Sequence, residues 1–312
     1  MLISADQLTS GGTMAPEEMA IADRSHIYVV CRRPSLRFDP STFVYSKGQA
    51  VGDLLYSVGG VVRRLPFSIE FPLLDGAVSV SISPYPHREM RTYDSQGSIV
   101  RYLPANALSI REGQHVDRPE LANLEVLYVG QSFASGNRSA FTRLQSHSTL
   151  QKILAEASYE DPDGEIFVAT FVYEPYRILT LFDGKAKSVI SDERDSNRFF
   201  SILERPLKKS QQISLAEAAL IRYFQPRYNK IYKTNFPSTK VKVLASCYEL
   251  DFSGLSVEIN TDELNFQLFS DNVKPAMHHI SNIELFANSD RAGFFFFTDR
   301  DGGVKRAVQT IG

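Results

Sequence analysis

The chain has 312 residues, of which 43% are hydrophobic and 22% are charged, and its formal net charge at pH 7 is -2. These values are typical of a globular protein with two or three domains, and no run of residues approaches the roughly 18 apolar positions that a membrane span needs. The first twenty residues lack the pattern of a signal peptide, and the cysteines Cys31 and Cys247 have no metal-ligand spacing, so we expect a cytoplasmic protein without membrane contact.

The first hundred residues predict a β-rich region. Their apolar residues occur in short, often β-branched runs between glycines and prolines rather than at helical spacing. The expected strands are His26–Cys31, Phe43–Tyr45, Gly60–Arg64, Phe67–Phe71 and Ala77–Ser83. A polar, proline-containing break at Tyr85–Gly97 predicts a boundary, so we expect residues 1–97 to form an N-terminal domain.

From about Ser98 to Tyr232, strands and helices alternate. The expected strands are Ile99–Leu103, Glu125–Val129 and Glu165–Tyr173. The expected helices are Ser139–His147, Thr149–Ala157 and Leu215–Phe224. This pattern predicts an α+β domain over residues 98–239.

The last part of the chain, residues 240–312, returns to a strand pattern. The expected strands are Lys240–Tyr248, Leu255–Ile259, Phe266–Phe269 and Phe294–Phe297. The last of these consists of four consecutive phenylalanines, which favours a strand that is buried on both faces over a lipid or partner site.

Positive charge is concentrated in the segment Arg194–Lys240. This segment holds ten lysines and arginines and only three acidic residues, which gives it a local net charge of +7. Such a charge suits a polyanionic partner, although a solvated basic face would carry the same charge.

Tyr128 ends the strand-like run Leu124–Val129, and Gly130 lets the chain turn out of that run. A tyrosine in this place is able to offer its hydroxyl to a cleft, or to pack as an ordinary strand residue. Arg143 and His147 follow at helical i,i+4 spacing, which puts both side chains on one face. Arginine matches a phosphate with two parallel donors and histidine can relay a proton, but a solvated helix surface shows the same pattern.

Glu217 has two interpretations. In the first, Ser214 and Glu217 form a capping box that starts the helix. In the second, the carboxylate of Glu217 points into a cleft and binds one hard divalent cation, which needs few protein ligands because it keeps several waters. Pro226 then ends the helix, and Asn229 hydrogen-bonds the backbone or the substrate.

The ordered set Tyr-Val-Gly at Tyr128, Arg-x-x-x-His at Arg143 and EAALIRYFQPRYN at Glu217–Asn229 resembles the GIY-YIG nuclease family. The last segment is especially similar to the N-terminal incision domain of bacterial excision-repair nucleases. The resemblance covers about residues 99–232. It implies a small mixed sheet flanked by helices, β-rich N- and C-terminal regions outside it, and a single-metal site that hydrolyses DNA.

Position by position, the resemblance implies two sets of site residues. Glu217 would hold Mg²⁺ or Mn²⁺, and the catalytic residues would be Tyr128, Arg143, His147, Tyr102 and Asn229. For nucleic-acid binding we expect Gln131, Arg138, Arg222, Arg227 and Lys230. Tyr102 enters this set because the family has a Gly-Ile/Val-Tyr strand about ten residues before its second tyrosine strand, and Val100-Arg101-Tyr102 is the best substitute upstream of Tyr128.

The resulting functional hypothesis is a divalent-metal-dependent DNA endonuclease, as in restriction or phage defence, with double-stranded DNA as the partner and the flanking β-rich regions for recognition. A homodimer is expected if one metal site per chain is to cut both strands. A DNA-repair incision nuclease is the close alternative. A catalytically dormant nucleic-acid-binding protein with a nuclease fold is the alternative from another class, because the first Gly-Ile-Tyr triplet is missing.

Overall fold

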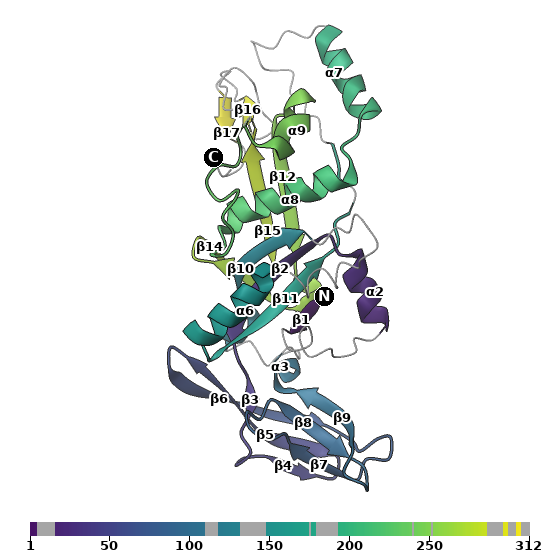
Figure 1. Ribbon diagram of the computed structural model, residues 1–312, viewed down its shortest axis with the longest axis vertical. Helices are drawn as coiled ribbons and strands as arrows, with labels where there is room; N and C mark the ends of the chain where they lie inside the picture. Colours follow the sequence, from purple (N-terminus) through teal and green to yellow (C-terminus); the bar gives the residue numbers. More distant parts are fainter. Residues whose placement is uncertain are drawn as a thin grey trace.

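The computed structural model describes residues 1–4, 16–109, 118–131, 148–174, 176–178, 193–238, 240–250, 252–285, 296–298 and 304–306. Helices and several small sheets occur together, in agreement with the predicted α+β class. The long axis of the molecule runs from a β-rich unit at one end, through a central sheet, to α7 (Glu193–Glu204) and α9 (Ala245–Glu249) at the other end (Figure 1).

The central sheet has six strands in the order β1-β11-β2-β10-β13-β14. They are β1 (Leu2–Ser4), β11 (Gly164–Phe171), β2 (Ile27–Pro34), β10 (Asn123–Gln131), β13 (Gln267–Ser270) and β14 (Val273–Ala276). Strands β10 and β13 run parallel, and the other neighbours are antiparallel. The sheet is therefore mixed and takes strands from the beginning, middle and end of the chain.

Strand β2 lies at the centre of this sheet and is buried on both faces. Ile27, Val29 and Cys31 belong to one hydrophobic cluster, and Tyr28 and Val30 belong to another. Successive side chains of a strand point to opposite faces, so the continuous apolar run that predicted this strand provides apolar contacts for both faces.

Helix α6 (Ser148–Glu160) covers the face that carries Tyr28 and Val30. Its residues Leu150, Ile153 and Ala157 are buried there. These three positions are spaced three and four residues apart, which places them on one side of the helix. The helix predicted at Thr149–Ala157 is confirmed.

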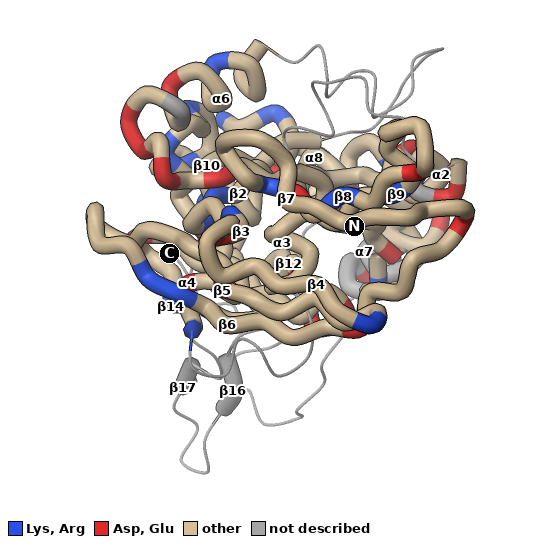
Figure 2. The backbone as a smooth tube through the Cα atoms, turned by 90° about the horizontal axis from the view of Figure 1, so that it is seen from below, with Lys and Arg blue, Asp and Glu red and all other residues tan. Residues whose placement is uncertain are grey.

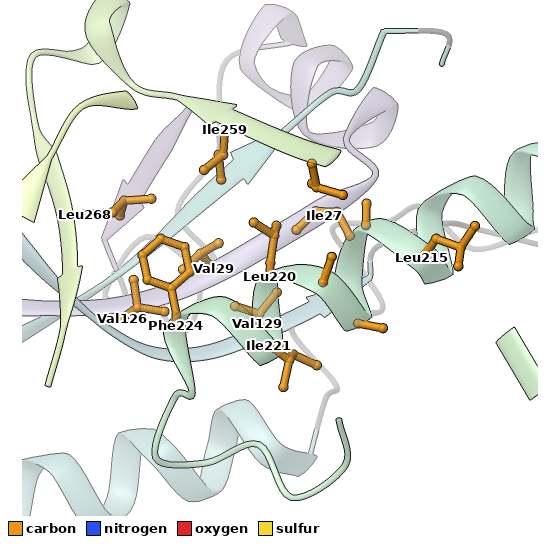
Figure 3. Close-up of a cluster of buried hydrophobic side chains, with 14 of the residues drawn as sticks. Ile27, Val29, Val126, Val129, Leu215, Leu220, Ile221, Phe224, Ile259 and Leu268 are labelled. Atoms are coloured by element: carbon orange, nitrogen blue, oxygen red, sulfur yellow. The ribbon is translucent and has the colours of Figure 1, made fainter. Parts of the chain in front are cut away.

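The opposite face is covered by α8 (Lys209–Phe224) and by the strand pair of β12 (Gly254–Asn260) and β15 (His278–Glu284). Figure 3 shows Leu220 and Phe224 of α8 among side chains of the sheet and Ile259 of β12. Hydrogen bonds also join these layers, because the Ser281 hydroxyl donates to the Ala219 carbonyl at 3.1 Å. Helix α8 is therefore held between two sheets.

Residues 35–122 form an inserted unit between the antiparallel neighbours β2 and β10. One of its sheets contains β3 (Arg37–Phe38), β4 (Val44–Ser46), β5 (Gln49–Val58) and β6 (Val61–Glu70). The other contains β7 (Ser79–Ile82), β8 (Glu89–Tyr93) and β9 (Ile99–Pro104), followed by α3 (Ala105–Leu108) and α4 (Pro119–Ala122). The unit has its own hydrophobic core, which includes Phe38, Phe67 and Met90.

The predicted division at residues 1–97, 98–239 and 240–312 is wrong in its boundaries. Strand β9 pairs with β8, so the boundary at 97/98 cuts a single sheet of the inserted unit. Strands β2 and β13 lie on either side of β10 in the central sheet, although they come from the predicted N- and C-terminal regions. Strand pairing across an insertion is a long-range property that local sequence patterns do not reveal.

Two predicted elements also need correction. The stretch predicted as a strand at Lys240–Tyr248 contains the 3-10 helix η1 (Lys242–Leu244) and α9, because Leu244 and Cys247, three residues apart, pack together into the α8 core. The helix predicted at Leu215–Phe224 begins at Lys209. Helices α2 (Pro16–Arg24) and α7 were not predicted.

Two predictions concern segments that are described in part or not at all. The predicted helix at Ser139–His147 lies outside the described residues. Of the predicted strand Phe294–Phe297, the last two residues begin β16 (Phe296–Thr298), which pairs with β17 (Val304–Arg306). In the part of the chain that the structure describes, no helix combines the length and the apolar character needed to cross a membrane.

Candidate functional site

Two tyrosines lie side by side at one end of the β2–β10 pair. Tyr28 of β2 is opposite Gly130, and Tyr128 of β10 is opposite Val30. The ring centroids of the tyrosines are 5.9 Å apart and their planes are tilted by 37°. Tyr28 is buried and Tyr128 is half-buried, so one phenol supports the other at the rim of the sheet.

Gly130 makes this arrangement possible. It lies inside β10, which continues to Gln131, and so it is not the point where the chain turns out of the strand as the sequence suggested. A Cβ atom at position 130 would be 2.6 Å from the Cζ and hydroxyl oxygen of Tyr28 and 2.8 Å from Cε1 of Tyr128. The glycine is required because the two tyrosine rings occupy the space of a side chain.

Tyr102 is not part of this site. It lies on β9 of the inserted unit, opposite Arg91, and 55% of its surface is exposed. The prediction that Tyr102 provides the second tyrosine is therefore wrong, because β9 joins the inserted unit instead of the central sheet. The tyrosine beside Tyr128 is Tyr28, from the strand predicted at His26–Cys31.

Glu217 does not cap its helix. Helix α8 starts at Lys209, where the Lys208 backbone N–H donates to the Gln211 side-chain oxygen at 2.9 Å. Glu217 lies two turns further along, near the end of β10. Its Oε1 accepts the backbone N–H of Gln131 at 3.2 Å, and its Oε2 accepts the side-chain Nε2–H of Gln131 at 3.1 Å. The capping interpretation is thus excluded, and the carboxylate faces the strand end that carries the tyrosines.

The electrostatic environment of Glu217 is unusual for a surface helix. Burial raises its pKa to about 7, and the hydrogen bond from the Gln131 N–H opposes this shift. Burial also raises the pKa of Tyr128, hydrogen bonds with Tyr28 and Thr149 lower it in part, and the negative charge of Glu217 raises it further. The effect of Glu217 on the pKa of Tyr128 places the two side chains within electrostatic range of each other.

Tyr232 is a further neighbour of Glu217 that the sequence did not reveal. Burial and, secondarily, the charge of Glu217 raise its pKa. Its backbone has a positive φ of 70°, which is uncommon for a residue with a side chain. The Tyr232 N–H donates to Oδ1 of Asn235 at 3.0 Å, which helps to hold this turn. The only sequence signal was its place three residues after Asn229.

Asn229 joins the end of the PRYN segment to β10. Its Oδ1 accepts the Val129 N–H at 2.9 Å, and its Nδ2–H donates to the Val129 carbonyl at 2.8 Å. The Tyr228 N–H donates to the Leu127 carbonyl at 3.0 Å. Of the two predicted roles, Asn229 therefore performs the backbone one, and it fixes the strand that carries Tyr128.

Two of the basic residues expected to bind nucleic acid have protein partners. Arg227 makes a two-pronged ion pair with Glu160 of α6 at 2.6 and 2.8 Å. Arg222 donates from Nη1 to the Lys233 carbonyl at 2.8 Å. Lys230 is exposed. Three other predicted residues, Arg138, Arg143 and His147, lie outside the described residues.

The donors around Glu217 fit a single hard cation. Over the described residues, no three His, Cys, Asp or Glu side chains come together as a metal-binding group. The causes of its raised pKa include no cationic side chain. A partly buried carboxylate with phenols and an amide nearby supplies oxygen ligands, and Mg²⁺ accepts such a sparse set because it retains water and binds substrate phosphate.

Comparisons with known proteins give no independent guide to this site. A scan against protein-family models and searches of curated proteins and solved structures found no match to the chain. The candidate site consists of Tyr28, Tyr128, Gln131 and Glu217, which lie at one end of the β2–β10 pair, with the tyrosines on the α6 side of the sheet and Glu217 on α8. The carboxylate and the amide oxygen can bind a cation, and phenols can orient a water molecule.

Proposed function

We propose that this chain is a divalent-metal-dependent DNA endonuclease of the GIY-YIG type, which hydrolyses phosphodiester bonds. The observation that carries the proposal is that the paired Tyr28 and Tyr128 lie at the same end of the β2–β10 pair as Glu217, whose charge acts on Tyr128. In sequence, these residues belong to three segments far apart. The order and type of the two later motifs are those of the resemblance to the nuclease family.

His26-Ile27-Tyr28 takes the place of the missing first triplet in this proposal. It forms the strand antiparallel to Tyr128-Val129-Gly130, with Tyr28 directly opposite Gly130. The family pattern has a glycine where this chain has His26, and a short connection where this chain has the inserted unit of residues 35–122. The two tyrosine strands are thus separated in sequence and adjacent in space, which supports an active site over the dormant alternative.

The proposed roles follow from the surroundings of each group. Glu217 holds Mg²⁺ or Mn²⁺, which when bound supplies neutralisation of the charge on the scissile phosphate. Tyr128 keeps its proton at neutral pH because burial and Glu217 raise its pKa, so it orients the attacking water and does not deprotonate it. Tyr28 hydrogen-bonds Tyr128 and fixes the direction of its hydroxyl.

DNA is the proposed substrate because the segment Arg194–Lys240, which contains Glu217, carries a net charge of +7. Arg222 and Arg227 are engaged with protein groups, so Lys230 is the stronger candidate for a phosphate contact among the three predicted residues of this segment. A homodimer and a role in restriction or phage defence are proposed on the same basis, since one metal site per chain would need two copies to cut both strands.

A cleavage assay tests the proposal. Purified protein is incubated with plasmid DNA, single-stranded DNA and RNA, in Mg²⁺, in Mn²⁺ and in EDTA. We expect metal-dependent cleavage of duplex DNA and a loss of about 100-fold or more in Glu217→Ala, Tyr128→Phe and Arg143→Ala, because each removes a group that acts on the transition state. Tyr28→Phe is expected to cost about 10-fold, as the loss of a supporting hydrogen bond.

Tyr102→Phe is the matched control, since Tyr102 is an exposed strand tyrosine in the inserted unit. It should cleave at the wild-type rate. Cleavage that survives unchanged in Glu217→Ala refutes the proposal. Binding of DNA without cleavage in either metal supports the dormant nucleic-acid-binding alternative instead.

A further inference from the structure

Gln131, the last residue of β10, is linked to α8 by three hydrogen bonds. Its backbone N–H donates to Oε1 of Glu217 at 3.2 Å, and its Nε2–H donates to Oε2 of the same carboxylate at 3.1 Å. The Ser214 hydroxyl donates to Oε1 of Gln131 at 3.4 Å. One glutamine therefore contacts both oxygens of Glu217 and a second side chain of the same helix.

The spacing on α8 determines how the Gln131 amide is oriented. Ser214 and Glu217 are three residues apart, so their side chains lie on the same side of the helix. An amide that bridges them has to turn its NH₂ group toward the carboxylate, which only accepts, and its oxygen toward the hydroxyl. The carboxylate fixes the direction of the NH₂ group, and the serine hydroxyl stabilises the same orientation by donating to the amide oxygen.

This arrangement leaves lone pairs of the Glu217 carboxylate available to a cation. An ionised carboxylate has about four lone-pair directions, two on each oxygen. Gln131 uses one on each oxygen, so one per oxygen remains for another partner. The hydrogen bonds restrict the rotation of the carboxylate without filling the positions that a metal ligand needs.

We propose that Gln131, itself oriented by Ser214, is a positioning residue that aims the carboxylate of Glu217 at the catalytic cation. This inference rests on the proposed function, because it assumes that Glu217 is the metal ligand. It assigns Gln131 to the metal site, whereas the sequence suggested that Gln131 contacts nucleic acid. Partners of this kind typically change metal affinity by about 10- to 100-fold when they are removed.

Metal binding without nucleic acid provides the test. Mn²⁺ is titrated into the full chain by isothermal titration calorimetry, for the wild type, Glu217→Gln, Gln131→Ala and Ser214→Ala. We expect Glu217→Gln to abolish binding and Gln131→Ala to weaken it by about 10-fold, since the backbone N–H of residue 131 still donates. Ser214→Ala should weaken it by only about 2- to 3-fold, because it releases the amide without removing it.

Gln96→Ala and Ser210→Ala are the controls, as an exposed glutamine turn residue of the inserted unit and an exposed serine of α8. Both should bind Mn²⁺ as the wild type does, and thermal unfolding checks that every variant is folded. If Gln131→Ala and Ser214→Ala bind Mn²⁺ with wild-type affinity while Glu217→Gln does not bind it, the positioning role is wrong and the proposed metal site stands. A wild type that binds no Mn²⁺, or equal binding in Glu217→Gln, overturns the proposed metal site and this inference with it.

Discussion

The two ends of the β2–β10 strand pair hold charged and polar side chains in opposite situations. At one end, Tyr28 and Tyr128 lie on the α6 side of the sheet, and Glu217 of α8 hydrogen-bonds the exposed Gln131. At the other end, where the inserted unit leaves the sheet, Arg33 is buried. Tyr28 and Arg33 are five strand residues apart, which corresponds to about 16 Å. One short strand pair thus connects the candidate site to the place where Arg33 holds the inserted unit on the central sheet, which we call the joint.

At the joint, the buried arginine is surrounded by partners. Arg33 donates to the Leu121 carbonyl at 3.0 Å and to the Asn106 carbonyl at 3.2 Å, and its guanidinium lies 4.6 Å from the centre of the Phe167 ring. Nδ2 of Asn106 in turn donates to Glu165 at 2.9 Å. Burial lowers the pKa of Arg33 to about 10, and the charge of Glu165 opposes that shift. These contacts fasten α3 and α4 of the inserted unit to the central sheet.

Ion pairs continue this pattern on the neighbouring residue. Arg32 binds Glu125 at 2.6 Å and approaches Asp161 at 3.3 Å. Figure 2 shows residues of both charges along the backbone of the inserted unit. In this unit, Arg64 binds Asp39 at 2.7 Å. The comparison teaches that a charged residue near the sheet indicates function only where its charge is uncompensated. Glu217 meets that condition among the described residues, because no cationic side chain contributes to its pKa shift.

Arg33→Met is expected to have the largest effect on stability. The substitution keeps the approximate volume and removes the donors to two buried carbonyls, which should lower the free energy of unfolding by about 2–4 kcal/mol. Unfolding in urea measures the change. If the joint is only structural, the Mn²⁺ affinity of the folded variant stays at the wild-type value.

Arg64→Met is the matched control for this prediction. Its side chain is 57% exposed and pairs with the buried Asp39 and with Asp53 of the inserted unit. Asp39 keeps its hydrogen bonds from Ser41 when Arg64 is removed. Because the exposed guanidinium contributes little to stability, the variant should lose less than Arg33→Met. If both variants lose the same free energy of unfolding, or if Arg33→Met changes the Mn²⁺ affinity, the joint is not a purely structural region separate from the site.

Gly130→Ala tests the other end of the strand pair. The new methyl group would lie 2.6 Å from the Tyr28 ring, so the ring has to move. We expect a loss of about 1–3 kcal/mol in the free energy of unfolding, as for other overpacked positions. DNA cleavage should fall as well, because the displaced ring no longer supports Tyr128.

A double variant separates this clash from a general weakness of glycine replacement in a strand. When Tyr28→Ala has already removed that ring, adding Gly130→Ala should cause a smaller loss of stability than in the wild type, because only the contact with Cε1 of Tyr128 at 2.8 Å remains. The two changes are in contact, so their effects are expected to be strongly non-additive. Simple additivity in urea unfolding would show that the Tyr28 ring is not the reason for the glycine.

The sequence predicted those parts of the site that are local. Tyr128 and Val129 lie on a strand and Asn229 follows the helix stop at Pro226, all as short patterns indicate. Tyr28 escaped prediction as a site residue because one hundred positions and a whole β unit separate it from Tyr128. Its strand was predicted, but no local signal specifies the strand with which it pairs.

Competition between local motifs explains the other errors. Ser214 and Glu217 have capping-box spacing, but Gln211 accepts the Lys208 N–H first and α8 starts there. A strand was predicted at Lys240–Tyr248, but packing of Leu244 and Cys247 against the α8 core favours helical turns. Tertiary contacts decide such short segments, where local preferences are weak.

The smallest expected effect is a dependence of stability on pH that comes from Glu217. Its folded pKa of about 7 is above the reference value of 4.5, so the folded state retains a proton that the unfolded state has lost between these two values. The stability contribution is therefore fully present below about pH 4.5 and is lost as the pH rises through about 7. Relative to Glu217→Gln, we expect the wild type to lose about 1–2 kcal/mol between pH 5 and pH 8 in EDTA, after allowance for partial exposure.

Glu160→Gln provides the opposite case within the same fold. The hydrogen bond from Arg227 is the main cause that lowers the pKa of Glu160, so Glu160 stays ionised from pH 5 to pH 8 in both states. The difference in stability between the wild type and Glu160→Gln should therefore show no slope in this window. Saturating Mn²⁺ should also remove the slope of the wild type, because a cation on Glu217 favours the ionised form that burial disfavours. If the slope persists in Mn²⁺, the cation does not bind Glu217. The Glu217 carboxylate would then have a structural role, as the charged residues at the joint do.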